Sequence, residues 1–149
     1  MSKPSDQRKL SKFLCFAVYS ANLAFGRAYK PLLDAAGVTY TQYITLLALS
    51  EEAGQTVKAL GEKLFLESNT LTPILKKLEA MGHIQRQRDP EDERQVRVSL
   101  TPSGRDLLEK ALRQSLIDAT GLGDEFPAVQ KTVVRLRDNL LANTQGRPD

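Results

Sequence analysis

The chain has 149 residues, of which 41% are hydrophobic and 26% charged, a composition typical of one folded domain over residues 1–149 with its own core. Its 21 basic and 18 acidic residues leave a net charge of +3, so attraction to a polyanion requires local clustering of charge. The single cysteine excludes an intrachain disulfide and a cysteine-based zinc cluster, and it indicates the reducing cytoplasm.

Residues 8–33 are predicted to form a first helix that is apolar around most of its circumference. Such a helix needs burial on more than one side, and a chain this small offers little surface for it, so a second subunit is the simplest partner. Polar residues at Tyr19, Ser20 and Asn22 interrupt the apolar run, which therefore indicates neither a secretion signal nor a membrane anchor.

Two shorter helices follow. The first can be capped by Thr39 or Thr41, and it ends near Gly54. The second begins at Thr56, and residues 65–67 form the tight connection that ends it.

A fourth helix is predicted from about Ser68 to Met81, closed by Gly82. Pro73 cannot donate a backbone hydrogen bond, and we expect it to be tolerated only near a helix start. The N-cap is therefore expected at Ser68, Asn69 or Thr70.

The hydrophobic period then changes from 3.6 to 2, which predicts a β-hairpin of residues 84–88 and 96–100 with residues 89–94 at its tip. Thr101 and Pro102 open a helix that is expected to reach Leu116. A last helix carries an apolar stripe over residues 126–140, and the tail from Asn143 is expected to fray.

Helix, turn, helix and hairpin over residues 41–100 form the winged helix-turn-helix arrangement, in which the second helix enters the major groove of double-stranded DNA. Amide, hydroxyl and methyl groups suit base edges, and cationic groups suit phosphate. The candidate DNA-binding residues are Ser68, Asn69, Thr70, Thr72, Pro73, Lys76, Lys77, Arg86 and Arg88. Alternatively, these side chains form an ordinary solvated surface.

The tip of the hairpin is acidic and should repel phosphate, unless Arg94 projects beyond the carboxylates into a narrow minor groove. In that case Asp92 orients Arg94 and does not itself contact DNA.

The wing sequence Asp89 to Arg94 closely resembles the D-x-x-D-x-R wing of MarR-type regulators. Within that family, four separated blocks resemble the organic hydroperoxide resistance regulators, in the same order and spacing. The resemblance covers about residues 13–108, and the blocks are residues 14–20, 29–33, 71–79 and 92–97.

Considered from the local sequence alone, Cys15 fits a buried core thiol, because its neighbours give only weak support for a stabilised thiolate. The resemblance implies a redox-sensing role for it. In these regulators two tyrosines, which match Tyr29 and Tyr40, reach across the dimer and hydrogen-bond the reactive sulfur. Tyr19 lies one helical turn from Cys15 and completes the candidate redox site.

Many relatives carry a second, resolving cysteine in their C-terminal helices, and this chain has none. The chain therefore resembles the one-cysteine type. Its oxidation should end at sulfenic acid, at a mixed disulfide with a low-molecular-weight thiol, or at overoxidation.

No cofactor or metal is expected, because His83 is isolated from any second histidine or cysteine that could complete a site. Carboxylates 91–93 lie side by side on a loop and do not form an acid/base pair.

We therefore predict a mainly α, homodimeric, winged helix-turn-helix repressor with a small β-wing. Residues 8–33 and 101–143 should form the dimerisation helices, and organic hydroperoxide should release a pseudo-palindromic operator by oxidising Cys15. One alternative is a repressor released by a small aromatic or lipophilic ligand, with Cys15 inert. A second, a thiol peroxidase, would need a resolving thiol and no DNA reader, so we expect the chain not to be an enzyme.

Overall fold

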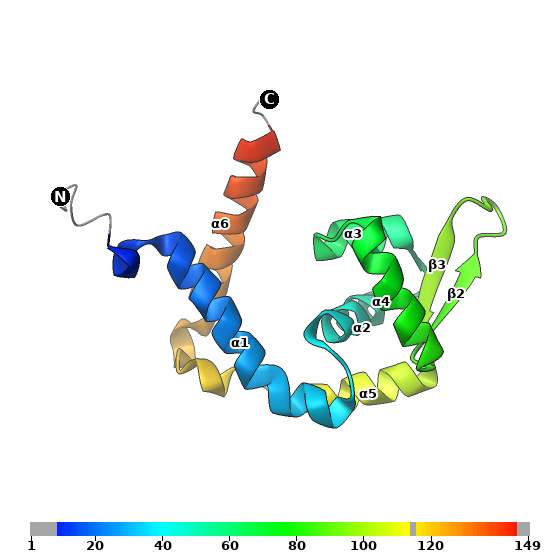
Figure 1. Ribbon diagram of the computed structural model, residues 1–149, viewed down its shortest axis with the longest axis horizontal. Helices are drawn as coiled ribbons and strands as arrows, with labels where there is room; N and C mark the ends of the chain where they lie inside the picture. Colours follow the sequence, from blue (N-terminus) through cyan, green and yellow to red (C-terminus); the bar gives the residue numbers. More distant parts are fainter. Residues whose placement is uncertain (1–8, 114–115, 146–149) are drawn as a thin grey trace. The chain divides into compact units, whose positions relative to one another are not determined.

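The computed structural model describes residues 9–113 and 116–145, which belong to two compact units divided after residue 114 (Figure 1). The first unit contains η1 (Leu10–Lys12), α1 (Leu14–Ala36), α2 (Tyr40–Glu51), β1 (Gln55–Thr56), α3 (Val57–Leu64), α4 (Ser68–Ala80), β2 (Ile84–Arg88), β3 (Val96–Leu100) and α5 (Pro102–Leu112). The second contains η2 (Asp118–Thr120), η3 (Gly123–Glu125) and α6 (Phe126–Gln145). None of the described helices has the length and apolar character that a membrane span requires.

Threonine caps fix the starts of three helices in the first unit. Thr39, and not Thr41, caps α2: its hydroxyl accepts from the Gln42 N–H at 3.2 Å, and Gln42 Oε1 accepts from the Thr39 N–H at 2.9 Å. Thr56 caps α3, and Thr101 caps α5 with Pro102 at its first position. These caps satisfy N–H groups that would otherwise have no partner within the helix.

The start of α4 differs from the prediction. Its N-cap is Glu67, so Ser68, Asn69 and Thr70 form the first turn of the helix and none of them is the cap. Pro73 consequently lies in the second turn, where its ring leaves the carbonyl of Asn69 without an intrahelical donor. All three first-turn side chains are exposed, which suits a helix end that is to be presented to a ligand.

The predicted hairpin is part of a three-stranded antiparallel sheet in the order β1-β3-β2. Gln55 pairs with Val98 in β1–β3, and Arg86 pairs with Val98 in β2–β3. The prediction missed β1 because two residues are too short to show alternation. This strand ties the end of α2 to the wing.

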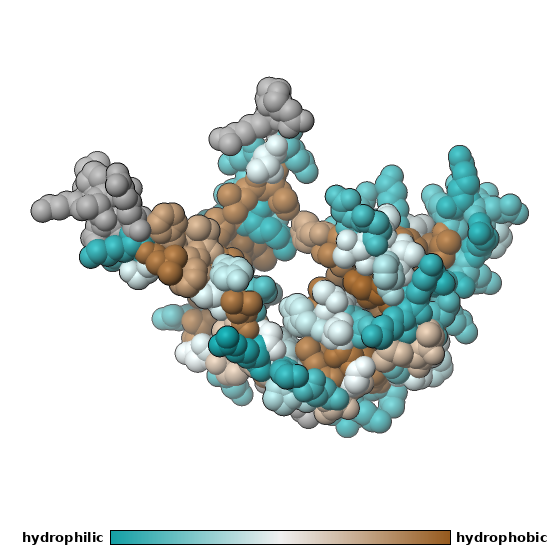
Figure 2. Space-filling view, viewed as in Figure 1, coloured by the Kyte–Doolittle hydropathy of each residue, from teal (hydrophilic) through white to brown (hydrophobic). Residues whose placement is uncertain are grey.

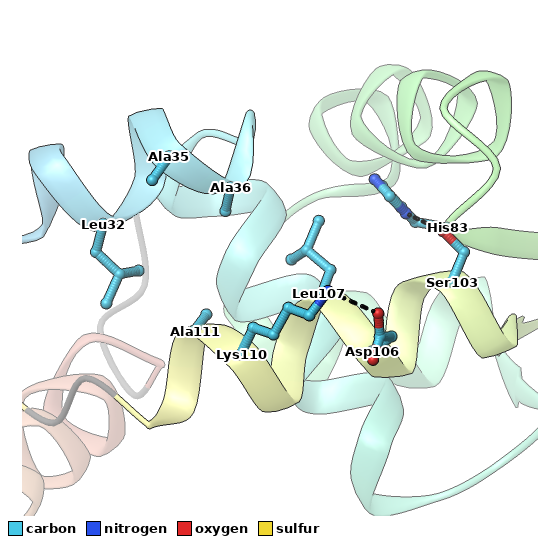
Figure 3. Close-up of a pocket in the computed structure, with 9 residues that line it drawn as sticks. All are labelled: Leu32, Ala35, Ala36, His83, Ser103, Asp106, Leu107, Lys110 and Ala111. Atoms are coloured by element: carbon cyan, nitrogen blue, oxygen red, sulfur yellow. Dashed lines mark hydrogen bonds and ion pairs between the residues drawn. The ribbon is translucent and has the colours of Figure 1, made fainter.

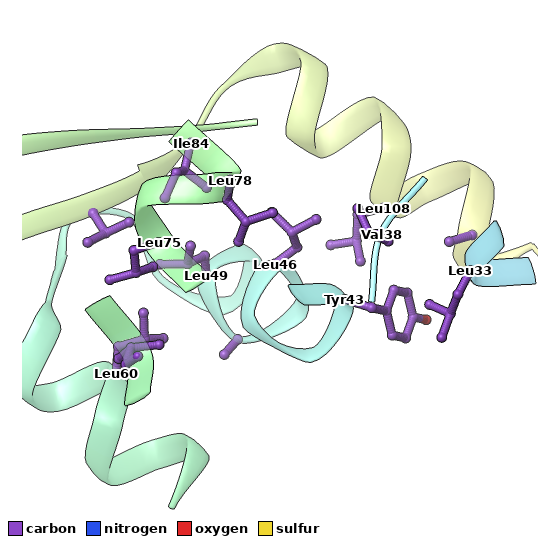
Figure 4. Close-up of a cluster of buried hydrophobic side chains, with 14 of the residues drawn as sticks. Leu33, Val38, Tyr43, Leu46, Leu49, Leu60, Leu75, Leu78, Ile84 and Leu108 are labelled. Carbon is purple, nitrogen blue, oxygen red and sulfur yellow. The ribbon is translucent and has the colours of Figure 1, made fainter. Parts of the chain in front are cut away.

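The core of the first unit lies between α2, α3, α4, α5 and the inner face of the sheet (Figure 4). Two glycines allow the close packing: a Cβ on Gly61 would lie 2.8 Å from the Leu66 carbonyl oxygen, and one on Gly104 would collide with the His83 carbonyl. The fully buried side chains include Leu46, Leu60, Leu71, Leu75, Leu78, Ile84 and Val98.

Most of α1 is not part of this core. Its buried residues are Leu32 and Leu33, near the C-terminal end, whereas large apolar side chains along the preceding turns are exposed. Figure 2 shows hydrophobic surface over the first turns of this helix. The exposed set is Leu14, Phe16, Val18, Tyr19, Leu23 and Phe25.

Several predicted boundaries differ from the structure. A 3-10 turn and Phe13 precede α1, which begins at Leu14 and continues three residues past Leu33, to Ala36, while residue 8 of the predicted helix lies outside the described residues. Helix α5 ends at Leu112 and does not reach Leu116. In the second unit α6 continues through Asn143 to Gln145, while the rest of the predicted tail lies outside the described residues.

Candidate functional site

Helix α4 presents a polar face opposite its buried leucines. Leu71, Leu75 and Leu78 point into the core, so the 100° step per residue carries Asn69, Pro73 and Lys76 to the opposite side. The Thr72 hydroxyl donates to the Ser68 carbonyl at 2.7 Å within the helix, which leaves its methyl group for apolar contact. This face combines an amide, apolar groups and a cation, the chemistry that reads base edges and binds phosphate.

Among the cations predicted to contact DNA, the two lysines of α4 are exposed, whereas Arg86 is engaged within the protein. Lys76 and Lys77 are exposed on α4. The Arg86 guanidinium instead donates to Glu79 Oε1 from Nε at 3.2 Å and Nη2 at 3.0 Å, and its backbone N–H donates to Glu79 Oε2. This pairing lowers the pKa of Glu79, mainly through the Arg86 side chain. Arg86 therefore ties β2 to the end of α4.

The wing tip holds Arg94 on Asp92. Asp92 Oδ1 accepts from Arg94 Nε at 3.1 Å and from its backbone N–H at 3.2 Å, while the Arg94 side chain remains 90% exposed. Arg88 donates to the Glu93 carbonyl at 2.9 Å. The geometry agrees with the predicted arrangement of Asp92 as the residue that orients a projecting Arg94.

An ion pair that the sequence did not reveal lies where the wing loop joins its two strands. Asp89 is buried, and its carboxylate accepts from Arg97 Nε at 3.0 Å. Arg97 also donates to the Gly54 carbonyl at 2.8 Å. Asp89 is the first residue of the wing motif, and the pairing of β2 with β3 brings it to Arg97.

Cys15 lies at the second position of α1 and is exposed, so it is not part of the core of its own unit. It borders an open, apolar hollow of about 310 Å³ that Leu10, Phe13, Phe16 and Tyr19 also line. The ring centroids of Phe16 and Tyr19 are 6.4 Å apart. The first turn of a helix favours an anion, and the apolar walls favour an alkyl group beside the sulfur.

Tyr29 and Tyr40 form a tyrosine cluster with a third residue, Tyr43. The Tyr29 ring centroid lies 5.5 Å from that of Tyr40 and 5.8 Å from that of Tyr43. Burial raises the pKa of Tyr40, and so does Tyr29 to a smaller extent. Both effects keep the Tyr40 hydroxyl protonated at neutral pH, so that it can donate a hydrogen bond. The i, i+3 spacing of Tyr40 and Tyr43 was the signal that could have found the third member.

The tyrosine cluster and Cys15 lie far apart along α1, with Cys15 in its first turn and Tyr29 in its C-terminal half. Cys15 and Tyr29 are separated by about 21 Å along the helix axis, at about 1.5 Å per residue. No hydrogen bond can span that distance, so one protomer by itself does not assemble the predicted redox site.

A second pocket, of about 320 Å³, lies between the C-terminal part of α1 and α5 (Figure 3). Leu32 and Leu107 contribute apolar walls, and Lys110 is paired with Asp106 at 3.1 Å. His83 Nδ1 lies 3.2 Å from Ser103 Oγ at one end. Among the described residues no group of three histidine, cysteine or acidic side chains could hold a metal ion.

Comparison with known proteins identifies the family. Residues 27–111 match the family described as transcriptional regulator SarA/Rot. The chain is 49% identical over 140 residues to the HTH-type transcriptional regulator TtmR of Methylorubrum extorquens, covering 92% of this chain and 72% of that protein. It is 48% identical to the organic hydroperoxide resistance transcriptional regulator of Bacillus subtilis, covering 75% and 76% of the two chains. The chain belongs to the MarR-type transcriptional regulators.

Solved regulators of this type share the fold. The structure of reduced AbfR bound to DNA has a TM-score of 0.76 and 34% identity, and it covers 93% of this chain and 99% of that one. The structure of overoxidized AbfR bound to DNA has a TM-score of 0.75 and 36% identity, and it covers 93% of this chain and 99% of that one. The winged helix-turn-helix prediction is confirmed, and these relatives are regulators, so they give no support to the thiol peroxidase alternative.

Within this regulator, the structure gathers the predicted DNA-binding residues on α4 and the wing, and it gathers Tyr29 with Tyr40. It does not bring either tyrosine to Cys15 within one chain. The predicted site did not include Tyr43, which the structure places in the buried core, nor the pair of Asp89 and Arg97, which joins the end of β2 to β3.

Proposed function

We propose that this regulator is a homodimeric repressor that releases its operator when an organic hydroperoxide oxidises Cys15. The observation that carries the proposal is the position of an exposed thiol in an apolar hollow at the start of α1, with the tyrosine cluster about 21 Å further along that helix. An antiparallel approach of a second α1 would place the tyrosines of each copy beside the cysteine of the other. This action suits the reducing cytoplasm, where the thiol is regenerated.

Exposed apolar surface supports the dimer. Large side chains along the first turns of α1 lie open to solvent, and α6 buries none of its residues. On α6 the exposed stripe includes Val129, Val133 and Leu140. Contiguous apolar surface of this kind marks an interface, and a second copy with two-fold symmetry covers the same surface on both chains.

The redox step would begin with attack of the Cys15 thiolate on the terminal oxygen of the hydroperoxide. The O–O bond breaks, the sulfur becomes a sulfenic acid, and the remaining alkoxide takes a proton and leaves as an alcohol. A low-molecular-weight thiol can then condense with the sulfenic acid to give a mixed disulfide and water. The Tyr29 and Tyr40 hydroxyls stabilise the thiolate before the reaction and lose that partner after it.

DNA binding would use α4 and the wing together. The α4 residues Ser68, Asn69, Thr70, Thr72, Pro73, Lys76 and Lys77 enter the major groove, and the wing places Arg94 in the adjacent minor groove. Arg88 lies at the start of the wing, and Arg86 supports α4 through Glu79. A dimer presents two such units to a pseudo-palindrome with half-sites about one helical turn, or 34–36 Å, apart.

The second candidate function is release by a small aromatic or lipophilic ligand, and the pocket between α1 and α5 is the observation in its favour. Its volume of about 320 Å³ is at the lower end of the range for small-molecule sites. The ammonium of Lys110, which could bind a carboxylate, is already paired with Asp106.

An operator titration separates the two functions. Wild type and Cys15→Ser are titrated with operator DNA before and after treatment with cumene hydroperoxide. We expect release of the oxidised wild type and unchanged binding of Cys15→Ser. A serine variant that is released as readily as wild type would overturn the proposal.

A further inference from the structure

The two ends of the wing loop are held by a carboxylate that the proposed DNA contacts do not use. Asp89 follows β2, and its side chain is only 8% exposed. Its Oδ1 accepts from the Glu91 N–H at 2.9 Å, and its Oδ2 accepts from Arg97 Nε at 3.0 Å. The Glu91 N–H and, to a smaller extent, the Arg97 guanidinium lower the pKa of Asp89, so the carboxylate is charged at neutral pH.

Asp89 also closes the loop that carries Arg94. Its backbone N–H donates to the Gln95 carbonyl at 2.9 Å, which joins the two ends of the loop. The Arg94 side chain is itself 90% exposed and is held by Asp92 within the loop. The direction in which Arg94 projects therefore depends on how Asp89 anchors the loop.

Arg97 connects this anchor to the body of the unit. It lies in the central strand β3, opposite Gln87 of β2 and Thr56 of β1. Its Nη1 donates to the Gly54 carbonyl at 2.8 Å, and the Gly54 N–H donates to Ser99 Oγ at 2.9 Å. Both backbone groups of Gly54, in the turn after α2, are therefore bonded to side chains of β3.

We propose that Asp89 and Arg97 are positioning residues for DNA binding, which fix the wing to the turn after α2 so that Arg94 reaches the minor groove. The Arg97 side chain is 47% exposed, but its guanidinium is engaged by the Asp89 carboxylate and the Gly54 carbonyl, so we expect it not to serve as a phosphate contact. This inference rests on the proposed contact of Arg94 with DNA.

Asp89→Asn separates a positioning role from a purely electrostatic effect, because the two predict opposite changes in operator affinity. The change removes a negative charge beside DNA, so electrostatics alone would tighten binding. Positioning predicts the reverse, a loss of operator affinity of about tenfold, because the wing loses its anchor. Glu91→Gln is the matched control: it removes the same charge from an exposed side chain of the same loop, and it should bind as well as wild type or slightly better.

A second pair of variants shows whether the effect acts through Arg94. Asp89→Asn and Arg97→Gln are each combined with Arg94→Ala, and operator affinity is measured over a range of salt concentrations. We expect no further loss in the double variants, because an arginine that is absent cannot be misplaced. Thermal unfolding reports whether each variant is folded. If Asp89→Asn does not fold, Arg97→Gln replaces it in the same test.

Three results would overturn this inference. Tighter binding by Asp89→Asn would show that only its charge matters. A further loss in both double variants would show general destabilisation, and a salt slope lowered by about one unit in Arg97→Gln would make Arg97 a phosphate contact. If Arg94→Ala alone binds as wild type, the proposed wing contact is itself wrong, and that result is distinct from the other three.

Discussion

Cys15 and Tyr29 lie on the same helix, α1, with about 21 Å of helix axis between them. Tyr29 packs against Tyr40 and Tyr43, while Cys15 opens onto an apolar hollow. A thiol and a hydroxyl so placed can hydrogen-bond only between two copies of the chain. The redox chemistry that we propose is therefore a property of the dimer, and it predicts that sensing and DNA binding can be separated by mutation.

Removing the hydroxyl of Tyr29 or of Tyr40 should slow the oxidation of Cys15 without affecting DNA binding. For Tyr29→Phe and Tyr40→Phe we expect the reaction of Cys15 with cumene hydroperoxide to slow by at least about tenfold, since a hydrogen bond to a charged group contributes about 1.5–3 kcal/mol. Stopped-flow measurement of thiol loss gives the rate, and an operator titration of the reduced variants gives affinity. Tyr43→Phe, which removes a hydroxyl from the same cluster, should react as wild type. Wild-type rates in both Tyr29→Phe and Tyr40→Phe would contradict the assignment.

Truncating the wing arginine should weaken operator binding strongly. Arg94→Ala should cost about 1–3 kcal/mol, and Asp92→Ala should cost less, because it only misdirects Arg94. Fluorescence anisotropy with a labelled operator measures both. Arg105→Ala removes an exposed arginine from α5 and serves as the control. Equal affinities for Arg94→Ala and the control would show that the wing does not enter the groove.

The cations of α4 and β2 should differ in their salt dependence. Lys76→Ala and Lys77→Ala should each reduce the slope of log affinity against log salt by about 0.9 if each side chain contacts one phosphate. Arg86→Ala should leave the slope nearly unchanged and lower the thermal stability, because its guanidinium is paired with Glu79. A reduced slope with unchanged stability in Arg86→Ala would place that residue on the DNA.

Acid should destabilise the DNA-binding unit through two carboxylates. Hydrogen bonds to Glu79 and Asp89 lower their pKa values in the folded chain, so their contribution to the free energy of unfolding is fully present above the unfolded values, near pH 4. It is lost as pH falls below about 4, through the folded values. Urea denaturation over a pH series should show a steeper acid loss in wild type than in Glu79→Gln or Asp89→Asn. Identical acid slopes in all three proteins would be inconsistent with these pKa shifts.

A charge on the exposed face of α1 should break the dimer. In Leu23→Glu the new carboxylate would have to be buried at the interface without a partner, which costs several kcal/mol. Analytical ultracentrifugation at micromolar concentration should show a shift towards monomer. Gln87→Glu places the same charge on an exposed wing residue and should remain dimeric. A wild-type protein that is monomeric under these conditions would remove the basis of the sensing model.

Local signals in the sequence predicted much of the fold. The helix start at Thr56, the cap at Thr101, the period of α4 and the alternation of β2 and β3 each depend on neighbours within a few residues, and the structure confirms them. Strand β1 was missed because it is only two residues long, too short to show alternation, and its partner lies more than 40 residues away. The end of α5 was misplaced because Leu116 continues an apolar spacing that the backbone does not follow.

In the candidate site, too, the sequence predicted the features that depend on local pattern and missed the contacts between distant elements. The helix period and the wing motif predicted the exposed face of α4 and the projection of Arg94 beside Asp92. The bond from Arg97 to Gly54 and the pair of Arg86 and Glu79 join different elements of the fold, so only the folded chain reveals which cations are already engaged. Whether the predicted residues act on DNA and peroxide stays a prediction until it is measured.

The central claim is that each Cys15 is served by the tyrosines of the other copy, and mixed dimers test it most directly. One chain carries Cys15→Ser, and its partner carries Tyr29→Phe with Tyr40→Phe, each with a different affinity tag so that the mixed dimer can be purified. The one remaining cysteine then shares its own chain with the phenylalanines and faces intact tyrosines on the other chain. We predict that this cysteine reacts with cumene hydroperoxide at the rate of wild type. A rate as slow as that of the homodimer carrying both tyrosine substitutions would contradict the account.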